Sequence, residues 1–294
     1  MTFWTGLQAL PFSLAMCDAG GVPTRYLEAG PDAGDGERTV IFLHGVNGHL
    51  EVFAKNVAAH AAEYRVLALD LLGHGYTGKP DHDYEIAHYI DHVLAFMDAA
   101  GVARASLVGT SLGGWISARI AARMPERVET LSLVSSGGLT AYTAVMDKLR
   151  TLGTQAAGAT EGSNDDDPRA AVRKRLEFVI KDKALVSDEL VEARWRIYQQ
   201  PDYKHALPHI LCLQDMEIRT RNLLREDELN RISARTLVLW TEDDPTATLA
   251  DGKRYADAIP GARFEVFDAS SHMPQFEEPD RFNALHLAFL RGEA

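Results

Sequence analysis

The segment 109–113, Gly-Thr-Ser-Leu-Gly, constrains the fold of this chain more than any other stretch. An apolar run at 105–108 leads into it, and a small, apolar, helix-periodic run at 115–124 follows it. A strand, a sharp turn with the G-x-S-x-G pattern and a helix form the setting of a nucleophile elbow. The glycines leave room for a serine on a strained turn, and the helix N-terminus favours negative charge beside it. Ser111 is therefore a candidate nucleophile.

The length and composition suit one large α/β domain with an insertion: 294 residues, 46% of them hydrophobic and 24% charged. A net charge of −12 argues against nucleic acid or an anionic membrane surface as the main partner. No apolar run approaches the roughly 18–20 residues that span a bilayer. A signal peptide begins with basic residues, and no Lys or Arg occurs before Arg25. Cys17 and Cys212 suit a reducing compartment. We therefore expect a cytoplasmic protein that acts on a small molecule, with no membrane partner; a homo-oligomer stays open.

Strand-like and helix-like segments alternate along most of the chain. We predict buried or half-buried strands at 12–17, 22–28, 39–43, 64–69, 105–108, 128–134, 235–240 and 264–268. The first two are joined by Asp-Ala-Gly-Gly at 18–21, a hairpin signal. Alternation of this kind predicts an α/β fold with a mostly parallel sheet and helices on both faces.

The alternation stops between residues 137 and 231. Only helix-like stretches occur there, at 141–152, 170–181, 187–199 and 203–224. We therefore predict an α/β core made of residues 1–136 and 232–294, interrupted by a helical cap at 137–231. An insertion over the carboxyl ends of the strands would form a lid on the active site.

A serine nucleophile needs a base within hydrogen-bond reach and an acid that orients the base. The strand at 235–240 is followed by Glu242, Asp243 and Asp244, and the last strand is followed by His272. Acid and base thus come after Ser111 in the order Ser, Asp, His, each in a loop at the carboxyl end of a strand. Any of the three acids could serve on this argument alone, and each could instead stabilise the turn before Pro245.

Several pieces together resemble the α/β-hydrolase family over nearly the whole chain. They are His44-Gly45, Asp70-x-x-Gly73-x-Gly75, Gly109-x-Ser111-x-Gly113-Gly114, Trp240-x-x-x-Asp244 and Ser271-His272. The resemblance implies an α/β-hydrolase fold with Ser111, Asp244 and His272 as the catalytic triad. It selects Asp244 because the family's acid falls four residues after the tryptophan. The oxyanion hole is then expected from the backbone N–H groups of Val46 and Leu112.

The cap resembles that of the meta-cleavage product hydrolases, which break a carbon–carbon bond in ring-opened 2-hydroxy-6-oxohexa-2,4-dienoates. The matching segments are Glu-Ala-Arg-Trp-Arg-Ile-Tyr at 192–198 and Ser-Ser-Gly-Gly-Leu at 135–139. This resemblance implies that Arg194 faces the substrate's carboxylate, which suits a planar guanidinium. We also expect Asn47, Trp195 and Met273 to contact substrate.

Other interpretations stay open at this point. Arg194 could be one of several cations on a solvated helix face; the others are Arg173, Lys174, Arg175 and Arg196. The unusual Val-Asn-Gly-His loop at 46–49 and Met273 leave room for a carboxylesterase or lactonase, or for a C–C hydrolase that acts on an atypical dienoate or a β-diketone. A member of the fold that only binds a small ligand is a separate alternative.

No metal or cofactor is expected. His88 and His92 are four residues apart on a predicted helix, but no HExxH glutamate accompanies them and their face looks exposed. The chain also has no phosphate-binding loop and no dinucleotide fingerprint.

Overall fold

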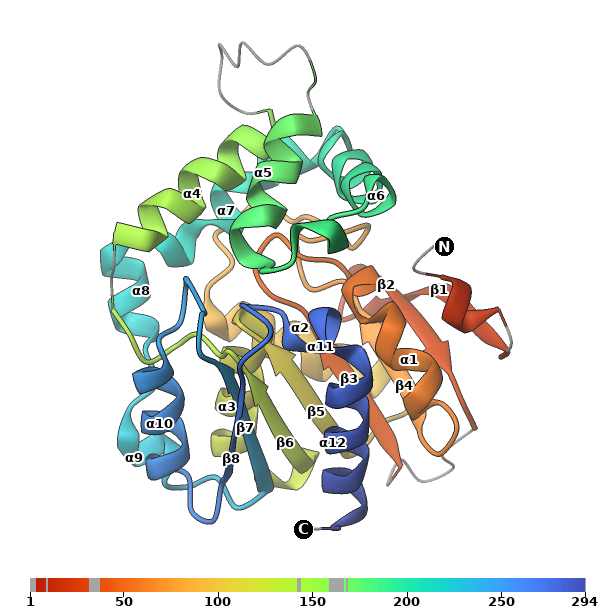
Figure 1. Ribbon diagram of the computed structural model, residues 1–294, viewed down its shortest axis with the longest axis vertical. Coiled ribbons are helices and arrows are strands. Elements are labelled where there is room, and N and C mark those ends of the chain that lie inside the picture. Colours follow the sequence, from red (N-terminus) through yellow and green to blue (C-terminus); the bar gives the residue numbers. More distant parts are fainter. Residues whose placement is uncertain are drawn as a thin grey trace.

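An eight-stranded sheet forms the centre of the protein in a computed structural model, which describes residues 4–8, 10–31, 38–141, 144–158, 167 and 169–293 (Figure 1). The strand order is β1-β2-β4-β3-β5-β6-β7-β8. The strands are β1 (Phe12–Ala19), β2 (Val22–Ala29), β3 (Thr39–Leu43), β4 (Arg65–Leu69), β5 (Ala105–Thr110), β6 (Val128–Val134), β7 (Arg235–Thr241) and β8 (Arg263–Phe267). The β1–β2 hairpin and the β2–β4 pair are antiparallel, and the other five pairs are parallel. The predicted α/β architecture and mostly parallel sheet are confirmed.

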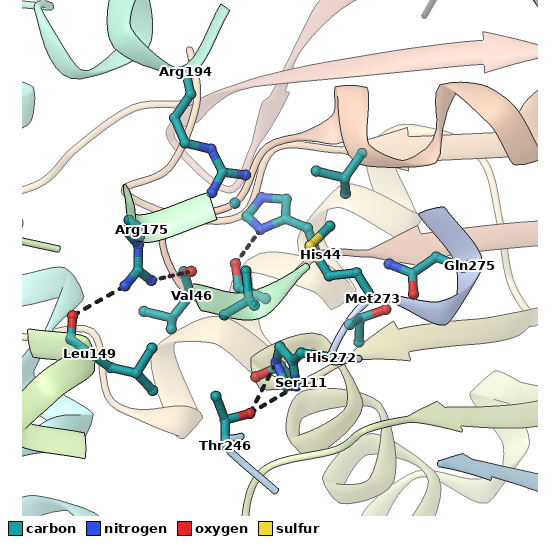
Figure 2. A pocket seen from close by; sticks show the side chains of 15 residues that line it. His44, Val46, Ser111, Leu149, Arg175, Arg194, Thr246, His272, Met273 and Gln275 are labelled. Carbon is teal, nitrogen blue, oxygen red and sulfur yellow. Dashed lines mark hydrogen bonds between the residues drawn. The ribbon is translucent and has the colours of Figure 1, made fainter. Parts of the chain in front are cut away.

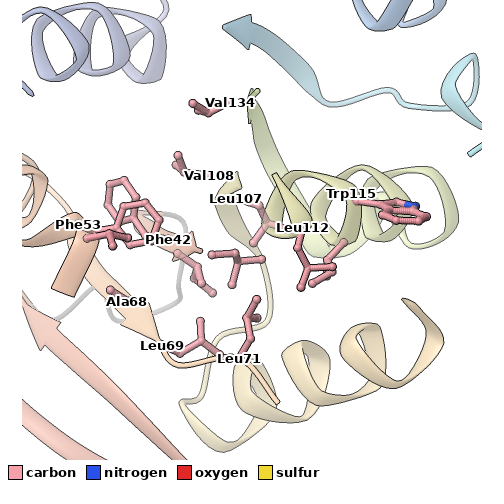
Figure 3. Close-up of a cluster of buried hydrophobic side chains, with 14 of the residues drawn as sticks. Phe42, Phe53, Ala68, Leu69, Leu71, Leu107, Val108, Leu112, Trp115 and Val134 are labelled. Carbon is pink, nitrogen blue, oxygen red and sulfur yellow. The ribbon is translucent and has the colours of Figure 1, made fainter. Parts of the chain in front are cut away.

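Helices cover both faces of this sheet (Figure 1). Helices α1 (Ala54–His60) and α12 (Pro279–Arg291) lie in front of it, and α2 (Ile86–Ala99) and α3 (Leu112–Arg123) lie behind. Every residue of β3 and β5 is buried. Strands covered on both faces read as continuous apolar runs, which is why they were recognisable in the sequence. Figure 3 shows part of the resulting core, including Phe42, Leu107 and Val134.

The segment between β6 and β7 contains helices but no strand among its described residues, and it lies over one end of the sheet (Figure 1). Its helices are α4 (Ala144–Ala156), α5 (Arg169–Val179), α6 (Asp188–Tyr198), α7 (Tyr203–Ile210), α8 (Met216–Asn222) and α9 (Glu226–Leu229), called the cap helices below. The domain boundaries at 137 and 231 stay predictions.

The single helix predicted at 203–224 is wrong: the chain breaks it into α7 and α8. Asp215 has an extended backbone, and its side chain accepts hydrogen bonds from the amides of Glu217 and Ile218. Aspartate competes with the helix for backbone donors and is favoured at N-caps, so it begins a new helix instead of continuing the old one. Helices α9, α10 (Leu249–Ala258) and α11 (Pro274–Glu277) were not predicted.

Two histidines meet in the core between α1 and α12. His60 donates from Nδ1 to the Asn56 carbonyl, and its Nε2 lies 2.8 Å from His286 Nδ1. Since His60 Nε2 must then accept from His286, both rings fit this network in their neutral forms. Burial lowers the pKa of His60 to about 4, and it lowers the pKa of His286 well below its ordinary value.

Buried neutral histidines predict acid-sensitive folding. Burial also lowers the pKa values of His74 and His92 to about 4, so between pH 6.5 and 4 the unfolded chain binds protons that the folded chain does not. Stability therefore falls as pH falls through this window, by about 2 kcal/mol per histidine from pH 7 to pH 5. Asp70, whose pKa burial raises to about 6, opposes the trend. Urea unfolding at the two pH values checks this; equal or greater stability at pH 5 contradicts it.

Among the described residues, no helix combines the length and the apolar character that crossing a membrane demands.

Candidate active site

Ser111 lies on a sharp turn between β5 and α3. Its backbone angles, φ 55° and ψ −112°, are in a region that residues other than glycine rarely occupy. A Cβ on Gly109 would lie 2.2 Å from the Gly113 carbonyl oxygen, and one on Gly113 would lie 2.1 Å from that of Leu43. Both motif glycines are therefore required by backbone contact. The amide of Ser111 donates to Val134, and its carbonyl accepts from Gly137, so the strained turn is held from β6 and the segment after it.

His272 and Asp244 meet at the ends of β8 and β7. His272 Nδ1 lies 2.8 Å from Asp244 Oδ2 and 2.8 Å from the hydroxyl of Thr246. The other carboxylate oxygen, Oδ1, accepts from the amides of Thr246 and Ala247 and from the Thr246 hydroxyl. This arrangement fixes Nδ1 as the protonated nitrogen of His272 and leaves Nε2 able to accept a proton.

The Asp244 carboxyl is held ionised. Burial opposes ionisation, but the nearby His272 and the amide of Thr246 outweigh it and keep the pKa of Asp244 below its ordinary value. Asp243, the alternative acid, points elsewhere: its side chain is 63% exposed and pairs with Lys181 at 2.6 Å. Of these two neighbouring acids, only Asp244 faces the histidine.

A cavity of about 580 Å³ opens beside Ser111 and His272. Its floor comes from the sheet ends and its roof from the cap helices. The lining residues are His44, Gly45, Val46, Gly48, Val52, Thr110, Ser111, Leu149, Arg175, Val179, Arg194, Thr246, His272, Met273 and Gln275. Figure 2 shows Ser111, His272 and Thr246 at one side, with the guanidinium groups of Arg175 and Arg194 entering from the opposite side.

The loop after β3 approaches Ser111 closely. A Cβ on Gly45 would lie 3.1 Å from Ser111 Cβ, and the amide of Gly48 closes a turn onto the Gly45 carbonyl. His44 holds this loop, because its Nδ1 donates to the Gly45 carbonyl and its Nε2 accepts from the Leu71 amide. Val46 therefore sits beside Ser111, and Leu112 follows it as the first residue of α3, where an amide has no acceptor within the helix.

Arg194 lies inside the cavity and not on a solvated face. It is 4% exposed, and its Nε donates to His49 Nε2 over 3.3 Å. His49 Nδ1 lies 2.7 Å from Glu51, which in turn pairs with Arg25. The unusual histidine of the 46–49 loop thus holds one edge of Arg194 and leaves the two terminal nitrogens of that guanidinium toward the cavity. No sequence pattern marks His49 for this contact with Arg194.

Two of the predicted substrate contacts, Asn47 and Trp195, do not line this cavity, and their contact with substrate stays a prediction. Asn47 is absent from the lining of this cavity; its backbone is left-handed, and its side chain lies against Tyr203 and α4. Trp195 is also absent from the lining, because one step along α6 turns it 100° from Arg194, and it stacks under Arg169 at 4.0 Å. Met273 does line the cavity.

Among the lining residues that were not predicted, Arg175, Thr246 and Gln275 carry polar side chains that bear on the chemistry. Arg175, taken above as an alternative solvated cation, is 4% exposed and faces the cavity. It lies on the apolar stripe of α5 with Val172, Leu176 and Val179, a helical spacing that could have revealed it. Thr246 bridges Asp244 and His272. Gln275 is fully buried, and its side-chain amide has no hydrogen-bond partner among the described residues.

A second cavity, of about 620 Å³, lies on the other side of Ser111. It shares Val46, Leu149 and Thr246 with the first. Its own lining is mostly apolar and includes Leu112, Trp115, Met146, Ile210 and Leu213, with Ser135, Gln214 and Arg219 as polar members. Ser111 therefore stands between a cationic space and a largely apolar one.

The histidines considered for metal binding have other roles. His92 is buried, not exposed, and contacts the Thr24 hydroxyl and the Leu72 amide. Within the described ranges, one surface group, Asp81, His205 and His209, has metal-ligand atoms close together. These side chains hydrogen-bond to one another across the junction of α7 and the loop before α2, away from Ser111.

Comparisons with known proteins agree with this geometry. A family profile described as "alpha/beta hydrolase fold" matches residues 38–279. A 2-hydroxy-6-oxononadienedioate/2-hydroxy-6-oxononatrienedioate hydrolase of Comamonas testosteroni is 32% identical over 88% of this chain and 89% of its own length. A dihydrolipoyllysine-residue acetyltransferase component of an acetoin cleaving system, from Cupriavidus necator, is 30% identical over 94% of this chain and 68% of its own. The structure of a meta-cleavage product hydrolase of Pseudomonas fluorescens superposes with a TM-score of 0.79 and 25% identity, covering 95% of this chain and 98% of that one.

Proposed function

Because the chain belongs to the α/β-hydrolase fold family, we propose that it cleaves a carbon–carbon bond in a ring-opened 2-hydroxy-6-oxohexa-2,4-dienoate. Ser111 serves as nucleophile, His272 as base and acid, and Asp244 as the group that orients His272. The substrate class follows the names of two relatives, a 2-hydroxy-6-oxononadienedioate hydrolase and a meta-cleavage product hydrolase.

The observation that carries the substrate class is the placement of Arg194. A buried guanidinium lines the same cavity as Ser111 and His272, and among the described residues no carboxylate forms an ion pair with it. A buried cation without a counterion is costly unless a ligand supplies one. A carboxylate at the end of the substrate fits this site, whereas a simple neutral ester leaves Arg194 unpaired.

The reaction begins with recognition of the acid end. The substrate's carboxylate binds Arg194. The enol next to this carboxylate then ketonises with the help of His272, and the ketone formed there accepts the electron pair when the carbon–carbon bond breaks. The distal ketone then lies at Ser111, between the two cavities, and the substituent beyond it occupies the mostly apolar one.

Bond cleavage follows at the distal ketone. Ser111 Oγ attacks the ketone carbon while its proton passes to His272 Nε2, and the amides of Val46 and Leu112 stabilise the oxyanion. Collapse of this adduct breaks the carbon–carbon bond, and the electron pair passes into the departing dienolate, which takes up a proton. Water deprotonated by His272 then releases the remaining acyl group as a carboxylic acid.

A two-substrate assay tests the proposal. The protein should consume ring-opened dienoates with a much higher kcat/KM than p-nitrophenyl esters of the same acyl group, measured by the loss of dienolate absorbance and by release of nitrophenolate. Faster ester cleavage with no loss of dienoate would favour the esterase or lactonase alternative, and turnover of neither would favour the ligand-binding one.

Arg194→Met should lower kcat/KM for the dienoate about 10- to 100-fold, because one charge-assisted pair contributes about 1.5–3 kcal/mol. Ester cleavage should change by less than about threefold, since a neutral ester has no carboxylate to pair. Arg196→Met is the matched control: it removes a cation from the exposed side of α6, where the side chain pairs with Glu192. Unchanged kinetics on the dienoate in Arg194→Met would return Arg194 to a structural role.

A further inference from the structure

Arg175 is a second buried cation in the cavity beside Ser111. Its Nη1 donates to the Leu149 carbonyl over 3.1 Å, and its Nη2 donates to the Val46 carbonyl over a long 3.4 Å. Its Nε has no partner among the described residues. Backbone carbonyls therefore orient this guanidinium without neutralising it.

Arg175 and Arg194 face the same space from two helices, α5 and α6, that pack against each other. Within the described part of the chain, no carboxylate forms an ion pair with either arginine. Burial lowers the pKa of Arg175, Tyr198 raises it, and the like charge of Arg194 lowers it further. Two positive charges thus share one cavity, and the groups around them are mostly neutral.

This arrangement exceeds what a single carboxylate requires. One planar guanidinium already binds a carboxylate through two parallel hydrogen bonds. A second buried guanidinium that remains unpaired in that complex would keep its full desolvation cost. Two of them are balanced by a ligand that carries two negative charges on neighbouring oxygens.

We propose that Arg175 is a second anion-binding residue, and that Arg175 and Arg194 together bind a dianion whose two charged oxygens sit on adjacent carbons. The identity of the natural dianion rests on the proposed function: a 2-hydroxydienoate becomes such a dianion when its enol loses its proton. The same 2-oxido carboxylate forms again when the carbon–carbon bond breaks, because the released electron pair moves onto the oxygen next to the carboxylate. Arg175 then stabilises the negative charge that develops on this oxygen during cleavage.

Binding of small anions tests this without any turnover. Oxalate presents two adjacent carboxylates, acetate presents one, and titration calorimetry measures the affinity of each for the whole protein. Arg175→Met should weaken oxalate binding about 10- to 100-fold and acetate binding less than about threefold, whereas Arg194→Met should weaken both. Lys174→Met is the matched control, since it removes a charge from the exposed side of α5, and both affinities should stay as in the unchanged protein.

The outcomes separate the alternatives. An unchanged oxalate-to-acetate affinity ratio in a folded Arg175→Met protein would overturn the proposal, and Arg175 would then only tie α5 to Val46 and Leu149. Arg175→Lys, which keeps the charge but loses the fork, should fall between the two proteins and guards against a folding defect in the methionine variant. If oxalate selectivity depends on Arg175 but dienoates are not cleaved, the dianion site stands and the proposed reaction fails.

Discussion

Replacing Ser111 by alanine should lower kcat on a ring-opened dienoate by about four to six orders of magnitude. The hydroxyl is the only group removed, and alanine is no more strained than serine at φ 55°. The amides of Val46 and Leu112 and the cavity arginines stay in place, so binding of substrate and of oxalate should persist. Single-turnover kinetics together with calorimetry separate the two effects.

Ser132→Ala provides the control for this change. Ser132 is buried in β6, and its hydroxyl has no hydrogen-bond partner among the described residues, so its loss should leave turnover unchanged. A fall of only about tenfold in Ser111→Ala, well short of what a missing nucleophile produces, would mean that an activated water and not Ser111 attacks the ketone.

Replacing Asp244 by asparagine should reduce kcat by about three to four orders of magnitude. The amides of Thr246 and Ala247 pin one side-chain oxygen at this position, so the new amide nitrogen must face His272 Nδ1. Two donors cannot face each other, and the ring would move its proton to Nε2, the nitrogen that must accept one from Ser111. The steady-state rate against pH checks this, because hydroxide partly replaces the lost base at high pH.

Asp243→Asn tests the choice between the two acids. Its carboxylate is at the surface beside Lys181, so the substitution should leave kcat and KM unchanged. Comparable losses in both variants would contradict the assignment of Asp244 and indicate a general effect on the β7 loop.

The sheet and the elbow could be read from the sequence because their signals are local. All eight strands were placed within a few residues, because buried parallel strands are short apolar runs in the sequence. The elbow was recognisable because its glycines are required by close backbone contacts and fall at fixed positions around Ser111. The contacts of the cap were harder. Asn47 and Trp195 were placed in the cavity from their neighbours in sequence, but a left-handed turn and a 100° helical step direct their side chains away.

Arg175 shows the opposite failure. A run of three basic residues, Arg173 to Arg175, suggests a solvated face, and charge outweighed the helical spacing in that interpretation. The sequence also could not reveal that His49, 145 residues away along the chain, would hold Arg194. Such contacts depend on how the cap packs against the loop after β3, and no local sequence pattern predicts that packing.

Arg175 of α5 and Arg194 of α6 carry like charges into one cavity under the cap. In the ligand-free protein the two guanidinium groups repel each other, which destabilises the packing of α5 against α6. A bound dianion would replace this repulsion by attraction to both groups. A ligand that binds both arginines also links the two helices. Its binding free energy therefore adds to the stability of the α5–α6 packing. The proposed cleavage divides the substrate into two shorter acids, one held by the arginines of α5 and α6 and one left beside Ser111, so neither product spans core and cap. The proposed reaction therefore removes the covalent link that the intact substrate would make between the cap and the core.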